Sequence, residues 1–331
     1  MDIDFIITWV DGNDPEWQLE KSRYDGTGSD LRPRRYREWE TLRYLFRSIE
    51  RNAPWVHKVY LVTCGHLPGW LKKDAPKLEL VKHEDYIPKE WLPTFSSRTI
   101  DMNFHRIKSL SEHFVYFDDD MFITKKTEPE DFFKKGLPCD SATMWSWPSM
   151  TLNPGAPYWL APLINTTVIN RHFSKRTSVI KNWSKWFAPC YGKYVLSNLY
   201  LLPHRIFTGF VDHHIPCSYL KSACAEVWEK EEELLSETCS HRFRMSDDLN
   251  HWVFTYWQFA SGRFYPRSPD IGKKILLNTD NIDLIESSIR SERYKLLCLN
   301  DNSSEEDFDA LKERLKKILD AAFPDKSSFE L

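Results

Sequence analysis

Residues 116–122 read Tyr116-Phe117-Asp118-Asp119-Asp120-Met121-Phe122, so that three adjacent carboxylates end an apolar run. The run is short, aromatic and β-branched, which predicts a buried strand. Open α/β folds bind ligands in the crevice at the carboxyl ends of their strands. Three neighbouring Asp side chains cannot all stay ionised without a counter-charge, and Mg²⁺ holding a phosphate supplies one. An acidic turn is the other interpretation, and this run alone leaves both open.

Composition restricts the class of protein. The chain has 331 residues, which is enough to form a large core. Its net charge is -3, so it lacks the excess of Lys and Arg that is typical of nucleic-acid-binding proteins. The seven Cys are scattered and form no CxxC pair, which favours neither a zinc site nor a disulfide framework. We therefore expect a reduced, cytosolic protein. We also expect no signal peptide and no membrane-spanning helix.

Strand and helix signals alternate in the first part of the chain, which predicts a Rossmann-like α/β half. We expect strands at residues 4–10, 58–63, 78–81 and 113–117. Helices are expected at residues 37–52 and 98–111, where apolar residues recur on one face. Residues 11–15 read as a turn that ends the first strand.

The rest of the chain has weaker periodicity. Residues 136–216 are rich in Pro, Trp and Asn, and we interpret them as short helices and loops that form a wall of the cleft. Helices are expected at residues 218–235, 246–262 and 307–323, with late strands at 275–277 and 296–299. Asp247 and Asp248 would lie near the start of the second helix, where they suit its dipole. We expect a single domain over residues 1–331, with a nucleotide-sugar half at 1–135 and an acceptor and catalytic half at 136–331.

Further side chains could carry chemistry, although each has an ordinary structural alternative. An arginine cluster could pair with phosphate through bidentate forks, or could be a solvated basic surface. It consists of Arg32, Arg34, Arg35 and Arg37. His213 and His214 precede a Pro and could act as a base, or could bond to the backbone. Arg244 precedes a predicted helix, where it could reach a phosphate. Together with the Asp triplet, these residues form the set that phosphoryl transfer requires.

Four blocks of sequence carry a resemblance to a known family. The first covers residues 2–5 and 8–15, and the second covers residues 42–50 and 53–56. The second block continues through residues 92–97, 105–107 and the Asp triplet. The third comprises residues 214–216 and Arg244, and the fourth comprises residues 298–301, 323–324 and 327–330. In these blocks, which run in order from end to end, the chain resembles the bacterial type of the Stealth family of sugar-phosphate transferases.

The resemblance implies that the protein transfers a sugar 1-phosphate from a nucleotide sugar to a hydroxyl of a glycan acceptor, in capsular or exopolysaccharide biosynthesis. The donor would be a UDP-hexose or a UDP-N-acetylhexosamine, and nucleoside monophosphate would leave. Mg²⁺ is the implied cofactor, with Mn²⁺ as a substitute. The implied location is the cytoplasm, with at most a peripheral association with the inner face of the cell membrane. The implied fold is an α/β, Rossmann-like, glycosyltransferase-A-like mixed sheet with flanking helices and a helical, loop-rich insertion.

The resemblance also implies roles for particular residues. The catalytic residues would be Asp120, His214 and Arg244. The nucleotide-sugar-binding residues would be Asp11, Gly12, Asn13, Arg43, Ser96, His105 and Arg106. The metal ligands would be Asp119, Asp120 and Asp301. Two other functions stay open at this point: a metal-dependent glycosyltransferase that releases nucleoside diphosphate, and a non-catalytic carbohydrate-binding module.

Overall fold

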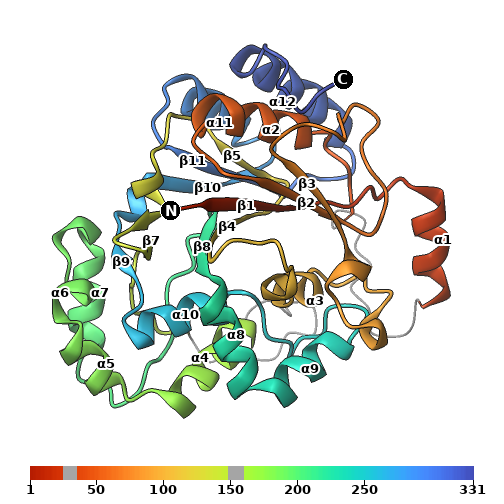
Figure 1. The fold of residues 1–331 in the computed structure, drawn as a ribbon. Helices are drawn as coiled ribbons and strands as arrows, with labels where there is room; N and C mark the ends of the chain where they lie inside the picture. Colours follow the sequence, from red (N-terminus) through yellow and green to blue (C-terminus); the bar gives the residue numbers. More distant parts are fainter. Residues whose placement is uncertain (25–35, 148–159) are drawn as a thin grey trace.

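The structure is a computed structural model that describes residues 1–24, 36–147 and 160–331. Its centre is a five-stranded sheet in the order β3-β2-β1-β4-β8 (Figure 1). The strands are β1 (Ile3–Thr8), β2 (Val59–Thr63), β3 (Leu78–Lys82), β4 (His113–Phe117) and β8 (Cys217–Leu220). The first four run parallel, and β8 pairs antiparallel with β4 in a register that sets Tyr116 opposite Cys217.

The central sheet is covered on both faces. Phe5 and Ile7 belong to one apolar core, whereas Ile6 belongs to the other. Val115 and Tyr116 of β4 are divided in the same way, because successive residues of a strand face opposite sides of the sheet. Strands that are apolar on both sides are typical of parallel sheets between two layers of helices.

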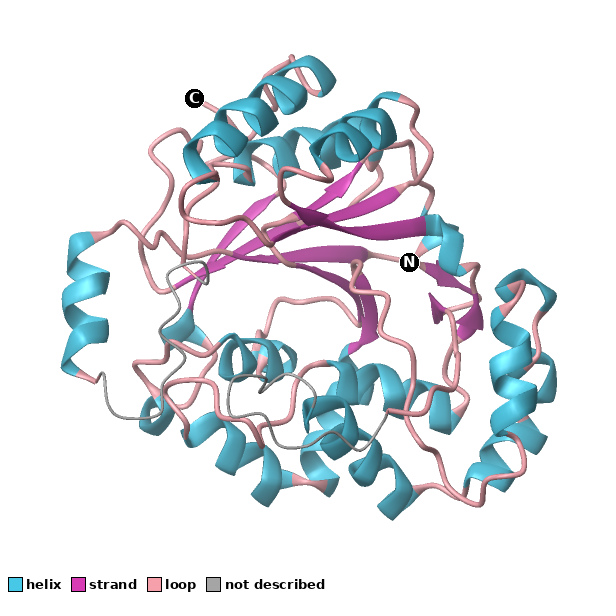
Figure 2. Ribbon diagram, turned by 180° about the vertical axis from the view of Figure 1, so that it is seen from behind, coloured by secondary structure: helices cyan, strands magenta, loops and turns pink. Residues whose placement is uncertain are grey.

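Helices form these two layers (Figures 1 and 2). One face carries α2 (Leu42–Asn52), α11 (Ile282–Arg290) and α12 (Phe308–Ala322). The other carries α3 (Ser97–Met102), α4 (Leu160–His172), α8 (Lys221–Lys230), α9 (Glu232–Ser240) and α10 (Trp252–Ser261). A side lobe, coloured green in Figure 1, contains α5 (Lys175–Lys181), α6 (Trp183–Trp186) and α7 (Tyr194–Leu201). The remaining helix, α1 (Pro15–Arg23), lies at the opposite side of the sheet in that view.

Two smaller sheets complete the fold. One contains β10 (Gly272–Leu277), β11 (Leu296–Asp301) and β5 (Met121–Ile123). The other contains β6 (Phe133–Lys134), β7 (Leu137–Asp140) and β9 (Tyr265–Pro266). In the first, Cys298 pairs with Lys274 on one side and with Met121 on the other. Because β5 begins directly after Asp120, this pairing places the middle of β11 beside the Asp triplet.

The predicted α/β class is confirmed: a mixed sheet has helices on both faces and a helical insertion formed by α4 to α7. Strands also form in the regions predicted for them, and so does the C-terminal helix. The predicted strand regions are residues 4–10, 58–63, 78–81, 113–117, 275–277 and 296–299. Within the described ranges, every helix is too short or too polar to cross a bilayer.

The N-terminal half contains one helix that was not predicted and one predicted helix that is too long. Residues 11–15 contain the predicted turn, and Asp14 also accepts bonds from the backbone N–H groups of Glu16 and Trp17 and so starts the unpredicted α1 at Pro15. The predicted helix at 98–111 ends at Met102. There the Asn103 side chain donates to the carbonyl of Thr99 at 2.8 Å, a local bond that competes with continuation of the helix.

Two predictions in the second half are also corrected. Residues 217–220 form a strand and not the start of a helix, because the edge of β4 offers backbone partners that outweigh local helix propensity. The helix predicted from residue 246 begins at Trp252. Asp248 is buried before it and accepts from the Met245 backbone at 2.7 Å and from His241 at 2.6 Å, so it does not serve a helix dipole.

Candidate active site

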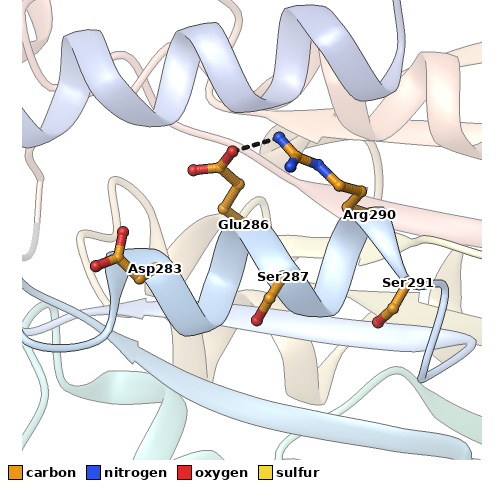
Figure 3. A pocket seen from close by; sticks show the side chains of 5 residues that line it. All are labelled: Asp283, Glu286, Ser287, Arg290 and Ser291. Carbon is orange, nitrogen blue, oxygen red and sulfur yellow. Dashed lines mark hydrogen bonds and ion pairs between the residues drawn. The ribbon is translucent and has the colours of Figure 1, made fainter.

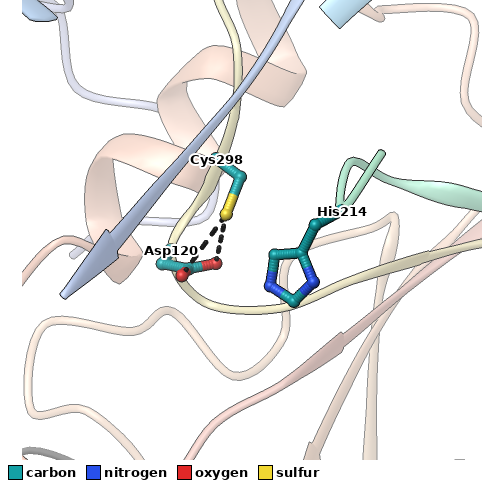
Figure 4. A group of neighbouring side chains, drawn as sticks. All are labelled: Asp120, His214 and Cys298. Carbon is teal, nitrogen blue, oxygen red and sulfur yellow. Dashed lines mark hydrogen bonds between the residues drawn. The ribbon is translucent and has the colours of Figure 1, made fainter. Parts of the chain in front are cut away.

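Asp120, His214 and Cys298 meet in one cluster, although they come from three distant parts of the chain (Figure 4). Asp120 lies in the turn between β4 and β5, His214 precedes β8, and Cys298 lies inside β11. The Cys298 thiol donates to both carboxylate oxygens of Asp120 at 3.5 Å. One oxygen, nitrogen or sulfur atom from each residue lies within 4.8 Å of the others. This spacing is small enough for the three side chains to contact one bound group.

The backbone of His214 supports a functional role. Its φ of +49° lies in the left-handed region, which few residues other than Gly adopt and which is costly to maintain. The ring meets the Trp252 ring edge-on, with 5.5 Å between centroids. The neighbouring His213 instead meets the ring of Tyr194, at 5.6 Å. The two adjacent imidazoles therefore contact different side chains.

Carboxylates crowd one side of the cluster. Burial, and then the charge of Asp118, raises the pKa of Asp120 to about 7. Burial, followed by the charges of Asp120 and Glu38, raises the pKa of Asp119 well above its usual value. Glu38 itself accepts from the indole of Trp9 at 2.9 Å. Carboxylates that repel one another in a dry site are stabilised by a cation, so this side of the cluster fits a divalent metal ion.

Positive groups also act on the cluster. Burial, and then the charges of Lys274 and Arg244, lowers the pKa of His214 to about 3. Arg244 donates from Nη2 to the hydroxyl of Ser97, in the first turn of α3. Lys274 comes from β10, next to Cys298. The imidazole of His214 is therefore neutral at physiological pH, and the charges of two cationic side chains act on it.

A hydrogen-bonded wall supports the Asp triplet from the side of the central sheet. The Tyr116 hydroxyl donates to Asp118 at 2.6 Å. Tyr219 pairs through its hydroxyl with Nδ1 of His251 at 2.8 Å, and burial lowers the pKa of His251 to about 4. The rings of Tyr116 and His251 meet edge-on at 5.1 Å. These contacts fix the end of β4 relative to α10.

The first predicted donor-binding turn is tightly built. The backbone N–H of Asp11 donates to Nε2 of His66 at 2.8 Å, and its carboxylate accepts from the backbone N–H of Asn13 at 2.9 Å. A Cβ on Gly12 would lie 1.7 Å from the carbonyl oxygen of Tyr36, so only glycine fits there. Burial raises the pKa of Glu38, and the charge of Asp11 adds to this rise, so this turn lies near the carboxylate side of the cluster.

The other predicted donor-binding residues are dispersed. Ser96 precedes α3 next to the Ser97–Arg244 bond, and its buried hydroxyl has no hydrogen-bond partner among the described residues. The guanidinium of Arg43 lies 5.6 Å from the ring of Trp70. His105 and Arg106 pack against Trp228, at 5.6 Å and 4.6 Å. The structure thus places Ser96 beside Arg244 and gives Arg43, His105 and Arg106 contacts of their own.

Asp301 is already engaged by other side chains. Its carboxylate accepts from the Ser303 backbone at 2.9 Å and from the indole of Trp39 at 3.2 Å. Arg37 approaches it at 3.9 Å. Metal ligation by Asp301 would therefore require these contacts to be exchanged. The other three arginines of the predicted phosphate-binding cluster, Arg32, Arg34 and Arg35, lie outside the described residues.

Sequence reasoning missed several residues of the site. Cys298 and Lys274 lie inside strands, and neither is among the predicted site residues. His251 gave no signal beyond its place near a helix start. A lysine pair at the beginning of a strand, as at Lys273-Lys274, is the one pattern that could have indicated Lys274.

A depression on α11 is separate from this cluster (Figure 3). It is lined by Asp283, Glu286, Ser287, Arg290 and Ser291. All five come from one helix or its C-terminal cap, and Arg290 pairs with Glu286 at 2.6 Å. It is therefore an exposed helix surface rather than part of the site.

Family models match three parts of the chain. Stealth protein conserved region 1 matches residues 1–29, conserved region 2 matches residues 35–139 and conserved region 4 matches residues 287–331. The predicted third block, with His214 and Arg244, lies between the last two matched ranges and stays a prediction.

Full-length relatives and a solved structure are also similar to the chain. It is 42% identical to a capsular polysaccharide phosphotransferase WcwK of Streptococcus pneumoniae, over 99% of this chain and 98% of the relative. It is 38% identical to a receptor polysaccharide phosphotransferase WefC of Streptococcus gordonii, over 99% of each. It is 36% identical to an exopolysaccharide phosphotransferase cps2G of Lactiplantibacillus plantarum, over 99% and 96%. The galactosyltransferase LgtC, solved with donor and acceptor sugar analogs, aligns over 97% of this chain and 96% of its own at 8% identity, with a TM-score of 0.42.

Proposed function

Because the chain belongs to the Stealth protein family, we propose that it transfers a sugar 1-phosphate from a nucleotide sugar to a hydroxyl of a glycan acceptor. The donor is a UDP-hexose or UDP-N-acetylhexosamine, and the product is a phosphodiester in a capsular or exopolysaccharide. Relatives of similar length are named phosphotransferases of such polysaccharides, which supports this proposal.

The observation that carries the proposal is the meeting of Asp120 and His214 in one cluster on which the charge of Arg244 acts. These groups differ in chemistry: they are a carboxylate, a neutral imidazole and a guanidinium. Phosphoryl transfer needs such a set, because it depends on positioning a nucleophile and offsetting charge on the phosphate oxygens.

In the proposed reaction, the acceptor oxygen attacks the phosphorus that carries the sugar. The bond from this phosphorus to the bridging oxygen breaks, and the nucleoside monophosphate leaves with that oxygen. His214 takes the proton of the acceptor hydroxyl, which its neutral imidazole is able to accept. The negative diphosphate of the donor offsets the charges of Lys274 and Arg244, which raises the pKa of His214 and helps it hold the proton.

Arg244 offsets charge on the transferring phosphate. Its bond to Ser97 holds one end of the guanidinium fork, and a fork matches the geometry of phosphate oxygens better than a point charge does. Asp119 and Asp120 are the proposed metal ligands, with Mg²⁺ as the ion, since hard cations prefer carboxylate oxygens. Such an ion supplies charge neutralisation on the diphosphate. The thiol of Cys298 is a poor partner for Mg²⁺, so we assign it to positioning Asp120 through their hydrogen bonds.

The identity of the released nucleotide tests the proposal. The protein would be incubated with a panel of nucleotide sugars and a glycan acceptor, in a preparation free of phosphatase, and the products separated by chromatography. Nucleoside monophosphate together with a phosphodiester-linked sugar is the expected result. Release of nucleoside diphosphate alone would instead identify an ordinary glycosyltransferase, which cleaves the bond at the sugar carbon.

A further inference from the structure

Large apolar side chains are exposed in unusual density on the side lobe. Among the described residues, seven of the fifteen exposed large apolar side chains lie between residues 180 and 206. Five of them lie on α7 or within a few residues of its end, and we call these five the α7 face. Its members are Leu196, Leu199, Tyr200, Leu202 and Ile206. Tyr200 is 80% exposed and Leu196 is 67% exposed, values expected of polar residues rather than of these types.

The α7 helix has its apolar stripe turned outward. Leu196, Leu199 and Tyr200 have the i, i+3, i+4 spacing of one helix face, yet this face points to solvent. The two buried residues of the helix are Asn198 and Leu201. Asn198 is fully buried, and its side-chain amide donates to the carbonyls of Ala142 at 2.9 Å and Trp186 at 2.6 Å.

Further bonds fix this orientation. Asn198 also accepts from the backbone N–H of Met144 at 2.6 Å, and Ser197 donates to the Met144 carbonyl at 2.6 Å. Lys175 is buried and donates to the carbonyl of His204 at 3.0 Å, just after the helix. The helix cannot rotate to bury Leu196 and Leu199 without leaving these buried polar groups unpaired. The exposed stripe is therefore part of the fold.

The surroundings of the α7 face are basic. From residue 141 to residue 211 the sequence contains seven Lys or Arg and no Asp or Glu, although the whole chain has a net charge of -3. Four of these cations are exposed on the side lobe: Arg176, Lys181, Lys193 and Arg205. Lys193 directly precedes α7, and Arg205 lies between Leu202 and Ile206.

We propose that the α7 face docks the protein onto an anionic lipid membrane. Apolar side chains flanked by Lys and Arg are the combination that binds an interface, where the apolar groups enter the acyl boundary and the cations meet acidic headgroups. A second copy of the chain is a poorer occupant. In a two-fold interface the same patch lies on both sides, so Lys193 and Arg205 would be brought toward like charges.

The helix that carries the α7 face also contacts the residue next to His214. Tyr194 is the first residue of α7, and its ring contacts that of His213, the residue before His214. Eight residues of helix span about 12 Å. A docked α7 face would thus hold the approach to His214 close to the lipid surface. The docking proposal itself does not depend on the reaction that the site performs.

Vesicle flotation tests the proposal with the full chain. The protein would be mixed with vesicles of phosphatidylcholine alone, or of phosphatidylcholine and phosphatidylglycerol. We expect flotation with the anionic vesicles, weakened by salt because the cations contribute through a screened field. Leu199→Gln with Tyr200→Gln should reduce partitioning by roughly tenfold or more, a change of about 1.4 kcal/mol. Lys193→Gln with Arg205→Gln should reduce it on the anionic vesicles.

Matched controls separate docking from general stickiness. Leu19 and Leu284 are exposed on α1 and α11, so Leu19→Gln with Leu284→Gln removes similar apolar area elsewhere and should leave flotation unchanged. Lys73→Gln with Lys108→Gln is the matched charge control. Equal binding by the α7 variants and the wild type would overturn the proposal, as would no binding to anionic vesicles. If the α7 variants instead dissociate a dimer in light scattering while the wild type ignores vesicles, the face is a self-association surface. Nucleotide release with a soluble acceptor should be the same in all variants, so a failure here is distinct from a failure of the proposed activity.

Discussion

The imidazole of His214 lies within 4.8 Å of the carboxylate of Asp120, while the adjacent His213 contacts Tyr194. This difference between neighbours makes a matched test. His214→Ala should lower turnover by roughly 100-fold or more, the usual size of general acid–base catalysis. Donor binding should change little, because the base contacts the acceptor proton. His213→Ala perturbs the same loop, and it should lower thermal stability more than turnover. A fully active, folded His214→Ala variant would rule out the base assignment.

Arg244 should be sensitive even to a change that keeps its charge. Arg244→Lys loses the planar fork and the bond to Ser97, so we expect roughly a tenfold or greater loss of kcat/KM, about 1.4 kcal/mol. Arg242 serves as the control, because it donates to the carbonyl of Pro93 at 2.6 Å and lies over Tyr24. Steady-state kinetics on Arg244→Lys and Arg242→Lys would show the contrast. Equal kinetics for both variants would argue that Arg244 only braces α3.

Removal of the metal ion should abolish activity. The acidic side of the site cannot also accommodate a diphosphate without a cation, so we expect EDTA to stop turnover and Mg²⁺ or Mn²⁺ to restore it. Asp120→Asn is nearly isosteric and should keep the melting temperature while losing most activity. Asp309→Asn, on the first turn of α12, is the control. Full turnover of a metal-free sample would contradict the metal assignment.

Zinc should act differently from magnesium at this site. A thiol, an imidazole and a carboxylate within 4.8 Å form a set that softer ions prefer. We expect Zn²⁺ to inhibit the Mg²⁺-supported reaction, and Cys298→Ser to weaken this inhibition by about tenfold or more. Cys64 is exposed, so Cys64→Ser controls for zinc binding at another thiol. Unchanged inhibition of Cys298→Ser would show that zinc acts elsewhere.

His105 should affect stability at low pH. Burial, and then the charge of Arg106, lowers its pKa to about 3 in the folded protein, whereas the unfolded chain binds a proton near its usual value of about 6.5. Between these values the unfolded state holds more protons, so stability falls as the pH falls. At about pH 5, the free energy of unfolding is lower by roughly 2 kcal/mol for this reason. His105→Phe should therefore make the melting temperature less sensitive to acid.

The same variant tests the predicted donor contact of His105. If His105 only packs against Trp228, donor affinity of His105→Phe should match that of the wild type in calorimetric titration. A large loss of affinity at an unchanged melting temperature would favour the predicted binding role. The exposed His204 provides a control for the pH series, since His204→Gln should leave the acid dependence unchanged.

The sequence was sufficient for the parts of the site that follow strands. The Asp triplet ends a run whose aromatic and β-branched character predicts β4, and it lies between β4 and β5 in the structure. It was not sufficient for Lys274 and Cys298, because their role depends on how β10, β11 and β5 pair. Pairing between strands that are distant in sequence leaves no local periodic signal. The strand β8 was missed for the same reason, since an available sheet edge decided its conformation.

The antiparallel register of β8 on β4 has a consequence for how the site can fail or change. Cys217 lies opposite Tyr116, so His214 and Asp120 each stand a few residues beyond one fixed pair. A slip by one residue would move the His-containing segment by about 3.3 Å and turn each strand side chain to the other face. It would thereby bring His213 toward the position of His214. An insertion or deletion in this edge strand could thus exchange which imidazole serves as the base while leaving both histidines in the chain, so alignment gaps here matter more than substitutions.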